Sequence, residues 1–227
     1  MNVRVARGID GARGATGHVV IVDVFRAFTT AAFCVAAGAR EIVLVSDHEQ
    51  ALALKRGDPT ILLTGEIGGK PIPGFDVGNS PSVIEHLDLS GRRVVQRTSS
   101  GTQGVVAAAA AEEIALGSFV IAGATAKYLA SVAREITIVA MGPRLNDDSD
   151  EDLACANYLA GVLRGEEPEM PCVPLLGDRV WSSPHDPDGW PSWFPRRDAE
   201  LALQLDRFDF ALPVVREGGL LVARPRR

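Results

Sequence analysis

The sequence predicts an α/β fold, with a mostly parallel sheet and helices on both faces in a three-layer sandwich. Two observations support this fold class. Short runs rich in β-branched residues alternate with helical stretches, which is the element order of parallel α/β proteins. The chain is also long enough, at 227 residues, to fill one large domain. We therefore expect residues 1–227 to form a single domain.

The first part of the chain shows this alternation clearly. Residues 19–22 form a continuous β-branched run, which suits a strand buried on both faces. Gly38 ends the helix that follows, and Asp47 is the expected N-cap of the next one. The expected strands are 18–24, 41–45 and 60–64, the expected helices are 27–37 and 47–56, and the Gly- and Pro-rich residues 65–81 are expected to be a long loop.

The alternation resumes after this loop. The expected strands are 93–97, 114–121 and 135–141, the expected helices are 102–111, 125–133, 150–164 and 198–206, and residues 213–224 are expected to be a hairpin. Residues 165–197 interrupt the pattern, because they contain all three tryptophans and seven of the 14 prolines. We interpret them as an irregular lid or packing segment, and an ordinary long surface loop is the alternative.

The composition excludes several classes of protein. The formal net charge is −6 and the pI is about 5.3, which argues against nucleic acid or an anionic membrane as a partner. No apolar run reaches the roughly 18 residues of a membrane span. Residues 1–17 lack the apolar core of a signal peptide, and the three cysteines fit no zinc or disulfide framework. These observations predict a soluble, cytoplasmic protein.

Polar residues follow the first expected strand directly. Ligands of open α/β sheets bind beyond the carboxyl ends of the strands. Asp23 could ligate Mg²⁺, which prefers oxygen ligands, and Arg26 could clamp an anion. Thr29 and Thr30 could add hydroxyl groups at the start of the next helix. The alternative is a structural ion pair between Asp23 and Arg26 with a threonine cap.

Three further segments could contribute to the same site. Glu66 follows a strand as Asp23 does, so the two could form a two-carboxylate metal site. Asp152 lies in an acidic stretch that suits a helix N-terminus, and it could also face the site. The loop at 98–102 could cradle a phosphate with its amides, with a serine-rich helix cap as the alternative. Its residues are Thr98, Ser99, Ser100, Gly101 and Thr102.

The ordered set of these segments resembles the 2-phosphosulfolactate phosphatase family of the ComB type. The matching segments are DVFRAFTT at 23–30, GE at 65–66, GFDVGNSP at 74–81, TSSGT at 98–102, GSF at 117–119, EDLACA at 151–156 and FDFAL at 208–212. Each segment alone is weak, whereas the set is specific and extends over nearly the whole chain.

This resemblance implies a ComB-like α/β fold and a Mg²⁺-dependent phosphatase. The implied reaction is the hydrolysis of 2-phospho-3-sulfolactate to 3-sulfolactate and phosphate, as in coenzyme M biosynthesis. By analogy, Asp23, Arg26 and Glu66 would be catalytic, and Asp23, Glu66 and Asp152 would hold the metal. The residues that would bind a small anionic phosphorylated substrate are Thr29, Thr30, Asn79, Ser80, Thr98, Ser99, Ser100, Gly101 and Thr102.

Three positions depart from the residues that are common in the family. Ile67 stands where an Arg is frequent, and Ser100 and Ile121 each stand where an Asn is frequent. Two alternatives therefore stay open: a phosphatase of the same mechanism for another phospho-acid, and a homologue that binds an anionic metabolite without catalysis. The alanine-rich helices could pack within the domain or against a second subunit, which leaves a homodimer open.

Overall fold

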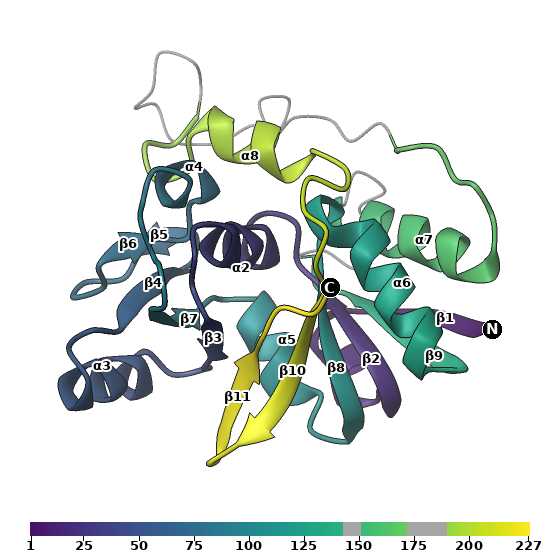
Figure 1. Cartoon of the computed structure of the whole chain (residues 1–227), viewed down its shortest axis with the longest axis horizontal. Helices are drawn as coiled ribbons and strands as arrows, with labels where there is room; N and C mark the ends of the chain where they lie inside the picture. The colour runs from purple at the N-terminus through teal and green to yellow at the C-terminus, as the bar shows by residue number, and fades with distance from the viewer. Residues whose placement is uncertain (143–150, 172–189) are drawn as a thin grey trace.

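The chain forms a mixed β-sheet with helices on both sides. The computed structural model describes residues 1–142, 151–171 and 190–227 (Figure 1). The strands are β1 (Asn2–Arg7), β2 (Gly17–Val22), β3 (Glu41–Leu44), β4 (Leu62–Ile67), β5 (Lys70–Pro71), β6 (Val77–Gly78), β7 (Arg93–Arg97), β8 (Ala111–Gly117), β9 (Glu135–Ala140), β10 (Leu212–Glu217) and β11 (Leu220–Ala223). The helices are α1 (Gly8–Arg13), α2 (Ala27–Ala36), α3 (His48–Gly57), α4 (Pro81–Ile84), α5 (Gly101–Ala107), α6 (Ala122–Val132), α7 (Glu151–Arg164) and α8 (Arg196–Ala202).

Two parallel groups of strands make up the sheet, and an antiparallel hairpin joins them. Its spatial order is β1-β9-β2-β8-β10-β11-β3-β7-β4-β5, with β6 also paired to β4. The hairpin of β10 and β11 is antiparallel to β8 on one side and to β3 on the other. Gly218 and Gly219 at its turn both have positive φ, as a two-residue turn matched to the strand twist requires. The hairpin therefore makes the two groups one continuous sheet.

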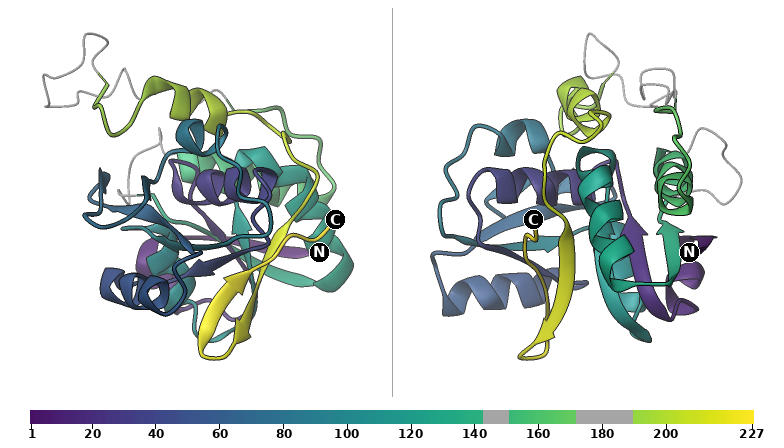
Figure 2. Two further views of the ribbon diagram at one scale, coloured as in Figure 1. Left: turned by 60° about the vertical axis from the view of Figure 1, so that its left-hand side comes forward. Right: turned by 45° about the vertical axis from the view of Figure 1, so that its right-hand side comes forward.

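Side chains of β2 alternate between two cores, as expected for a strand covered on both faces. Val19 and Ile21 pack with residues of α2 and α5, whereas Val20 and Val22 pack with residues of α6 and α7. Helix α3 covers the second group of strands on the face away from α2. Figures 1 and 2 show α3 and the α6–α7 pair at opposite ends of the molecule, with α8 above α2 and α4. The predicted layers of helix, sheet and helix are confirmed.

Most predicted elements are present, although several boundaries differ. The helix expected at 102–111 ends at Ala107, because Ala111 already begins β8. The strand expected at 114–121 ends at Gly117, and a short 3-10 helix, Phe119–Ile121, follows it. The loop expected at 65–81 contains β5 and β6, and α4 begins at its end. The N-cap prediction is confirmed, since the Asp47 carboxylate accepts a hydrogen bond from the Glu49 N–H (3.1 Å).

The sequence pattern indicates no element for residues 1–17, whereas the structure has β1 and α1 there. Strand β1 lies at the edge of the sheet and pairs in parallel with β9. Val3 packs in the core that α7 covers, and the Arg4 side chain donates a hydrogen bond to Thr137 Oγ1 on β9 (3.2 Å). Arginines interrupt the apolar pattern of this segment, which is why the strand is hard to recognise from sequence.

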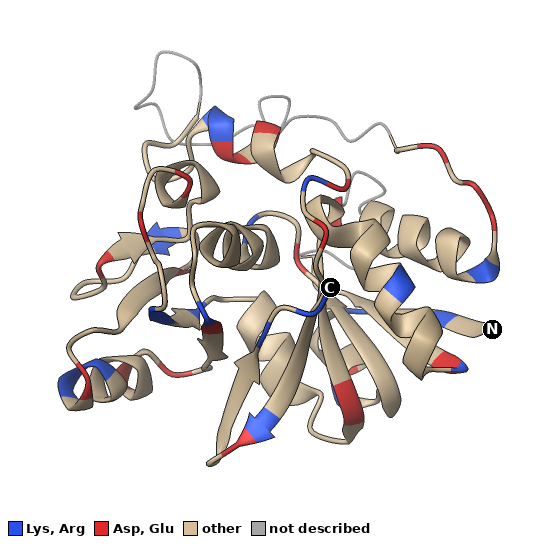
Figure 3. Cartoon of the chain, viewed as in Figure 1, with Lys and Arg blue, Asp and Glu red and all other residues tan. Residues whose placement is uncertain are grey.

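Part of the segment predicted as irregular at 165–197 lies outside the described residues, as do residues 147–150 of the acidic stretch. Within the described ranges, no helix has both the length and the apolar character that crossing a membrane requires. Figure 3 shows Lys and Arg interspersed with Asp and Glu along the ribbon, without a basic stripe in that view.

Candidate functional site

A pocket of about 320 Å³ lies where the ends of several strands meet. This is the position at which ligands of α/β sheets bind. Its polar lining comes from the ends of β2, β4, β6 and β7 and from the start of α7: Asp23, Arg26, Glu66, Asn79, Ser99, Ser100, Glu151 and Asp152. Its remaining lining consists of Phe25, Gly68, Gly69, Trp193 and Phe194.

Backbone N–H groups hold Asp23 at this pocket. Its Oδ1 accepts a hydrogen bond from the Ala27 N–H (3.0 Å), and the Gly101 N–H donates to the same carboxylate. A Cβ at Gly101 would lie 2.7 Å from Asp23 Oδ2, so only glycine permits this approach. Burial, with a smaller contribution from the charge of Glu66, raises the pKa of Asp23 from an ordinary 3.8 to about 6. Asp23 can therefore exchange a proton close to neutral pH.

The loop after β7 fixes Glu66. Glu66 Oε1 accepts a hydrogen bond from the Ser99 N–H (2.5 Å). Glu66 Oε2 accepts from the Gly69 N–H (2.6 Å) and from the Ser99 hydroxyl (3.0 Å). The amides of Ser99 and Gly101, which we expected to cradle a phosphate, thus bind the carboxylates of Glu66 and Asp23 instead.

The two threonines of this loop bind each other at the start of α5. The Thr98 N–H donates to Thr102 Oγ1 (2.8 Å), and the Thr102 N–H donates to Thr98 Oγ1 (3.0 Å). Both side chains are buried, and neither these threonines nor Gly101 line the pocket. Thr98 Oγ1 thus binds an N–H of the first turn of α5, whereas the N-cap residue Ser100 makes no side-chain cap bond. Ser99 and Ser100 do line the pocket, and Ser100 donates to the Met141 carbonyl oxygen (2.8 Å).

Three other residues expected to bind substrate also lie behind the pocket. The Thr29 hydroxyl donates to the Val24 carbonyl oxygen (2.8 Å), and the Thr30 hydroxyl is buried with no hydrogen-bond partner among the described residues. The Ser80 hydroxyl donates to Asp198 Oδ1 (2.8 Å). None of the three lines the pocket. Sequence spacing places them near the site but does not show which way they face.

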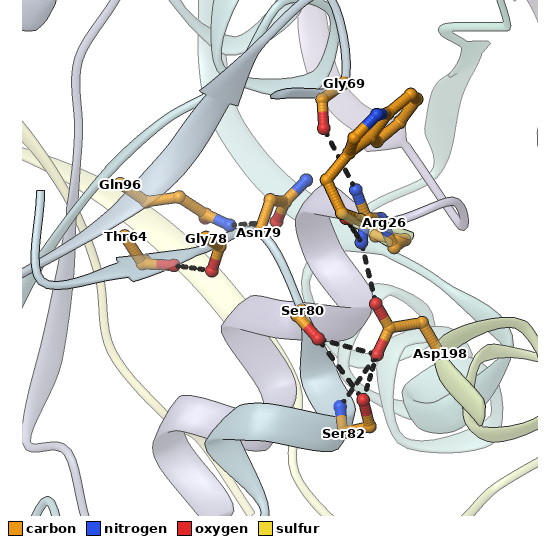
Figure 4. Close-up of polar contacts among 10 residues, drawn as sticks. Arg26, Thr64, Gly69, Gly78, Asn79, Ser80, Ser82, Gln96 and Asp198 are labelled. Atoms are coloured by element: carbon orange, nitrogen blue, oxygen red, sulfur yellow. Dashed lines mark hydrogen bonds and ion pairs between the residues drawn. The ribbon is translucent and has the colours of Figure 1, made fainter. Parts of the chain in front are cut away.

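Arg26 lines the pocket, and its ion-pair partner is Asp198 rather than Asp23. Arg26 Nη1 donates to Asp198 Oδ2 (2.7 Å), as Figure 4 shows, and it also donates to the Trp193 carbonyl oxygen (3.0 Å). The Phe194 ring lies against the guanidinium, with its centroid 4.0 Å from Arg26 Cζ. Burial lowers the pKa of Arg26, and the charge of Asp198 opposes this effect most strongly.

Asn79 supplies an amide to the pocket. Its Oδ1 accepts a long hydrogen bond from Gln96 Nε2 (3.5 Å), and Figure 4 shows the Asn79 amide nitrogen turned away from Gln96. The Asn79 side chain lines the pocket and is 4% exposed. It can therefore donate a hydrogen bond to an acidic ligand.

The carboxylates of the pocket fit a magnesium ion that relies on few protein ligands. Asp152 Oδ1 accepts a hydrogen bond from the Val24 N–H (2.6 Å), which places it beside the end of β2. Across the described ranges, no group of three or more Asp, Glu, His and Cys side chains is arranged to share one ion. Mg²⁺ commonly uses one or two carboxylates together with water and substrate phosphate. Asp23 and Glu66, whose charges interact in the pocket, match that donor set.

Sequence reasoning missed Asp198 and the aromatic wall of the pocket, which consists of Phe25, Trp193 and Phe194. Phe194 makes edge-to-face contacts with Phe25 (6.1 Å between ring centroids) and with Trp190 (5.6 Å). A Cβ at Gly69 would lie 2.5 Å from the nearest atom of the Trp193 ring, so this wall reaches the loop after β4. The abundance of tryptophan and proline in 165–197 is the one signal that points to these residues, and it does not identify their partners.

Together, the fold and the pocket define an α/β protein with a carboxylate-rich ligand site at the strand ends. The family model described as 2-phosphosulpholactate phosphatase matches residues 7–173. The chain therefore belongs to the 2-phosphosulfolactate phosphatase family, which confirms the resemblance seen in its motifs.

Curated relatives carry the same description, "Probable 2-phosphosulfolactate phosphatase". The chain is 35% identical over 149 residues to a protein of Bacillus subtilis, covering 64% of both chains. It is 39% identical over 145 residues to one of Carboxydothermus hydrogenoformans, covering 64% of this chain and 60% of the relative. A Deinococcus radiodurans protein is 43% identical over 125 residues, or 54% of this chain and 52% of the relative. The chain thus matches about half to two thirds of the length of these relatives.

Proposed function

We propose that this protein is a phosphatase that hydrolyses 2-phospho-3-sulfolactate to 3-sulfolactate and phosphate with the help of Mg²⁺, as in coenzyme M biosynthesis. Family membership and the names of the relatives support this substrate. The observation that carries the proposal is the pairing of Asp23, whose pKa is raised to about 6, with Glu66 in one pocket. Such a pair suits proton transfer and metal binding at a phosphoryl group.

Each polar residue of the pocket has a role in this proposal. Asp23 and Glu66 would hold Mg²⁺, with Asp152 beside them, and the ion would neutralise charge on the phosphoryl oxygens. Arg26 and Asn79 would donate hydrogen bonds to the anionic groups of the substrate. The aromatic wall of Phe25, Trp193 and Phe194 would exclude water from the reacting group.

Asp23 would act directly on the reaction. At pH 7 most of its carboxylate is ionised, because its pKa is about 6. In one route, it takes a proton from the attacking water, whose oxygen displaces the sulfolactate oxygen from phosphorus. In the other route, Asp23 itself displaces that oxygen and forms an acyl phosphate, which water then hydrolyses to phosphate and the free carboxylate. In both routes the P–O bond to sulfolactate breaks and the leaving oxygen takes up a proton. Trapping Asp23 with a phosphate-mimicking metal fluoride distinguishes these routes, because only the second route uses Asp23 as the nucleophile.

The test measures phosphate release from 2-phosphosulfolactate in Mg²⁺ and in excess chelator. We expect release in Mg²⁺ alone, and we expect Asp23→Asn and Glu66→Gln to abolish it. Asp76→Asn is the matched control, since Asp76 lies outside the pocket and binds the Leu63 N–H (2.7 Å). Full Mg²⁺-dependent activity in both pocket variants would contradict the assignment.

A second candidate is a phosphatase for a different phospho-acid. Ile67, which stands where an Arg is frequent in the family, is 45% exposed at the end of β4 and carries no charge itself. A panel of phosphorylated hydroxy acids separates the two candidates by their kcat/KM values. Binding of such acids without any phosphate release would instead indicate a module that binds metabolites.

A further inference from the structure

One carboxylate behind the pocket joins three parts of the chain. Asp198 lies in α8, and its side chain is fully buried. Asp198 Oδ2 accepts a hydrogen bond from Arg26 Nη1 (2.7 Å). Asp198 Oδ1 accepts from the Ser80 hydroxyl (2.8 Å), the Ser82 N–H (3.0 Å) and the Ser82 hydroxyl (2.5 Å). Figure 4 shows Arg26 on one side of this carboxylate and the two serines on the other.

The two carboxylate oxygens of Asp198 hold two pocket residues at fixed positions relative to each other. Arg26 lines the pocket and binds one oxygen. Asn79 also lines the pocket, and it immediately precedes Ser80, which binds the other oxygen. Because a carboxylate is planar and rigid, it fixes the separation between the Arg26 guanidinium and the turn that carries Asn79. Asp198 itself is not part of the pocket lining.

The Nη2 edge of the Arg26 guanidinium faces the pocket, where a ligand can accept a hydrogen bond from it. Its Nη1 is occupied by Asp198 and by the Trp193 carbonyl oxygen, and Phe194 covers one face. Among the described residues, its Nη2 makes one long hydrogen bond of 3.4 Å, to the Gly69 carbonyl oxygen. Gly69 also lines the pocket, so this nitrogen lies on the pocket side of the ion pair. The anchored nitrogen therefore determines where the other one points.

We propose that Asp198 is a positioning residue for substrate binding, which acts by orienting Arg26 and the turn at Asn79 toward an anionic group of the substrate. This inference rests on the proposed function, because it concerns the same pocket. The recognised group is a phosphate, sulfonate or carboxylate oxygen, since guanidinium and amide donors match each of these acceptors.

Asp198→Asn is the informative substitution. An asparagine of the same shape has one acceptor oxygen and one NH₂ group. The backbone N–H of Ser82 is a fixed donor, so the amide oxygen stays on that side and the NH₂ group then faces Arg26 Nη1. Two donors oppose one another there, and the guanidinium loses its anchor.

The test is a double-mutant cycle on KM and kcat with Asp198→Asn and Arg26→Gln. We expect Asp198→Asn to raise KM roughly tenfold or more in the wild-type background, and less than about threefold when Arg26 is already replaced. A merely structural role predicts a lower kcat from a smaller active fraction, with KM unchanged. Equal factors in both backgrounds would overturn the proposal.

Controls separate positioning from folding. Asp76→Asn removes an aspartate that binds Lys55 and the Leu63 N–H outside the pocket, so we expect a lower Tm with unchanged KM. Ser82→Ala removes one hydroxyl donor from Asp198, and it should raise KM less than Asp198→Asn does. If Asp198→Asn does not fold, Ser82→Ala takes its place in the cycle.

A binding measurement keeps this inference distinct from the proposed function. If wild-type protein releases no phosphate from 2-phosphosulfolactate, the proposed function fails. The wild type, the two single variants Asp198→Asn and Arg26→Gln and the double variant are then titrated with inorganic phosphate by calorimetry. Weaker binding in Asp198→Asn that disappears in the Arg26→Gln background supports the positioning role. Absence of this coupling, including absence of phosphate binding to the wild type, overturns it.

Discussion

Replacing Asp23 by Asn should abolish activity and stabilise the fold at neutral pH. The pKa of Asp23 rises from an ordinary 3.8 to about 6, mainly because the carboxylate is buried. One pKa unit corresponds to 1.36 kcal/mol, so the ionised side chain destabilises the fold by about 3 kcal/mol. The amide of Asn would leave either the Ala27 N–H or the Gly101 N–H without an acceptor, which costs about 1 kcal/mol. The net gain is about 2 kcal/mol, or about 4–8 °C in Tm for a chain of this size.

This gain depends on pH in a defined direction. The folded-state pKa of Asp23 lies above its unfolded value, so the proton that it binds stabilises the fold fully below about pH 4. That stabilisation is lost as the pH rises through about 6. Asn carries no titratable proton. The free energy of unfolding of the variant therefore rises relative to that of the wild type as the pH increases from about 4 through about 6. At pH 4 we expect it to be no more stable than the wild type.

The assay is urea unfolding of both proteins between pH 4 and 8 in excess chelator. Chelator is needed because an ion bound to the ionised carboxylate would stabilise the wild type selectively. Phosphate release in Mg²⁺ is measured in parallel, and we expect a loss of at least about a hundredfold. A variant that is less stable than the wild type at every pH, or a difference that does not change with pH, would refute the reasoning.

Three further predictions concern the sheet, a buried ion pair and the metal. Gly65→Ala places a Cβ 2.0 Å from the Arg97 carbonyl oxygen, so urea unfolding should show a loss of more than about 3 kcal/mol. Burial alone would raise the pKa of Glu41, but hydrogen bonds from Arg93 and Arg224 lower it below its ordinary value. Glu41→Gln should therefore lower the Tm at pH 7, and this loss should shrink as the pH falls below the ordinary glutamate pKa of 4.5 and Glu41 itself becomes protonated. The net charge of −6 repels an anionic substrate, so removing Mg²⁺ should weaken substrate binding, measured by calorimetry, more than raising the salt concentration does.

Local pattern was enough to predict most of the fold. The β-branched run at 19–22 identifies a doubly covered strand, and Val19 and Val20 do pack on opposite faces of the sheet. Gly218 and Gly219 identify the hairpin turn. Nothing in these patterns shows that the hairpin lies between two parallel groups of strands, because strand order depends on contacts between residues far apart in the chain.

The candidate site also contains residues that could be predicted from the sequence and residues that could not. Asp23 and Glu66 were predictable because each follows a strand, and the carboxyl ends of strands are where sheets bind ligands. The directions of Thr29 and Thr30 were not predictable, because both lie within α2, where packing decides which side chains face the core. Asp198 was not predictable either, since nothing near it in the sequence indicates that it binds Arg26.

By itself, the sequence determined the alternation of strands and helices, the family and the two carboxylates that follow β2 and β4, because these depend on local composition and ordered motifs. Only the tertiary structure decided what each polar group binds. The amides of the 98–102 loop bind Asp23 and Glu66, and Arg26 binds Asp198 at a separation of 172 positions. Buried donors and acceptors must all find partners, and only the folded chain determines which groups are within 3 Å of one another.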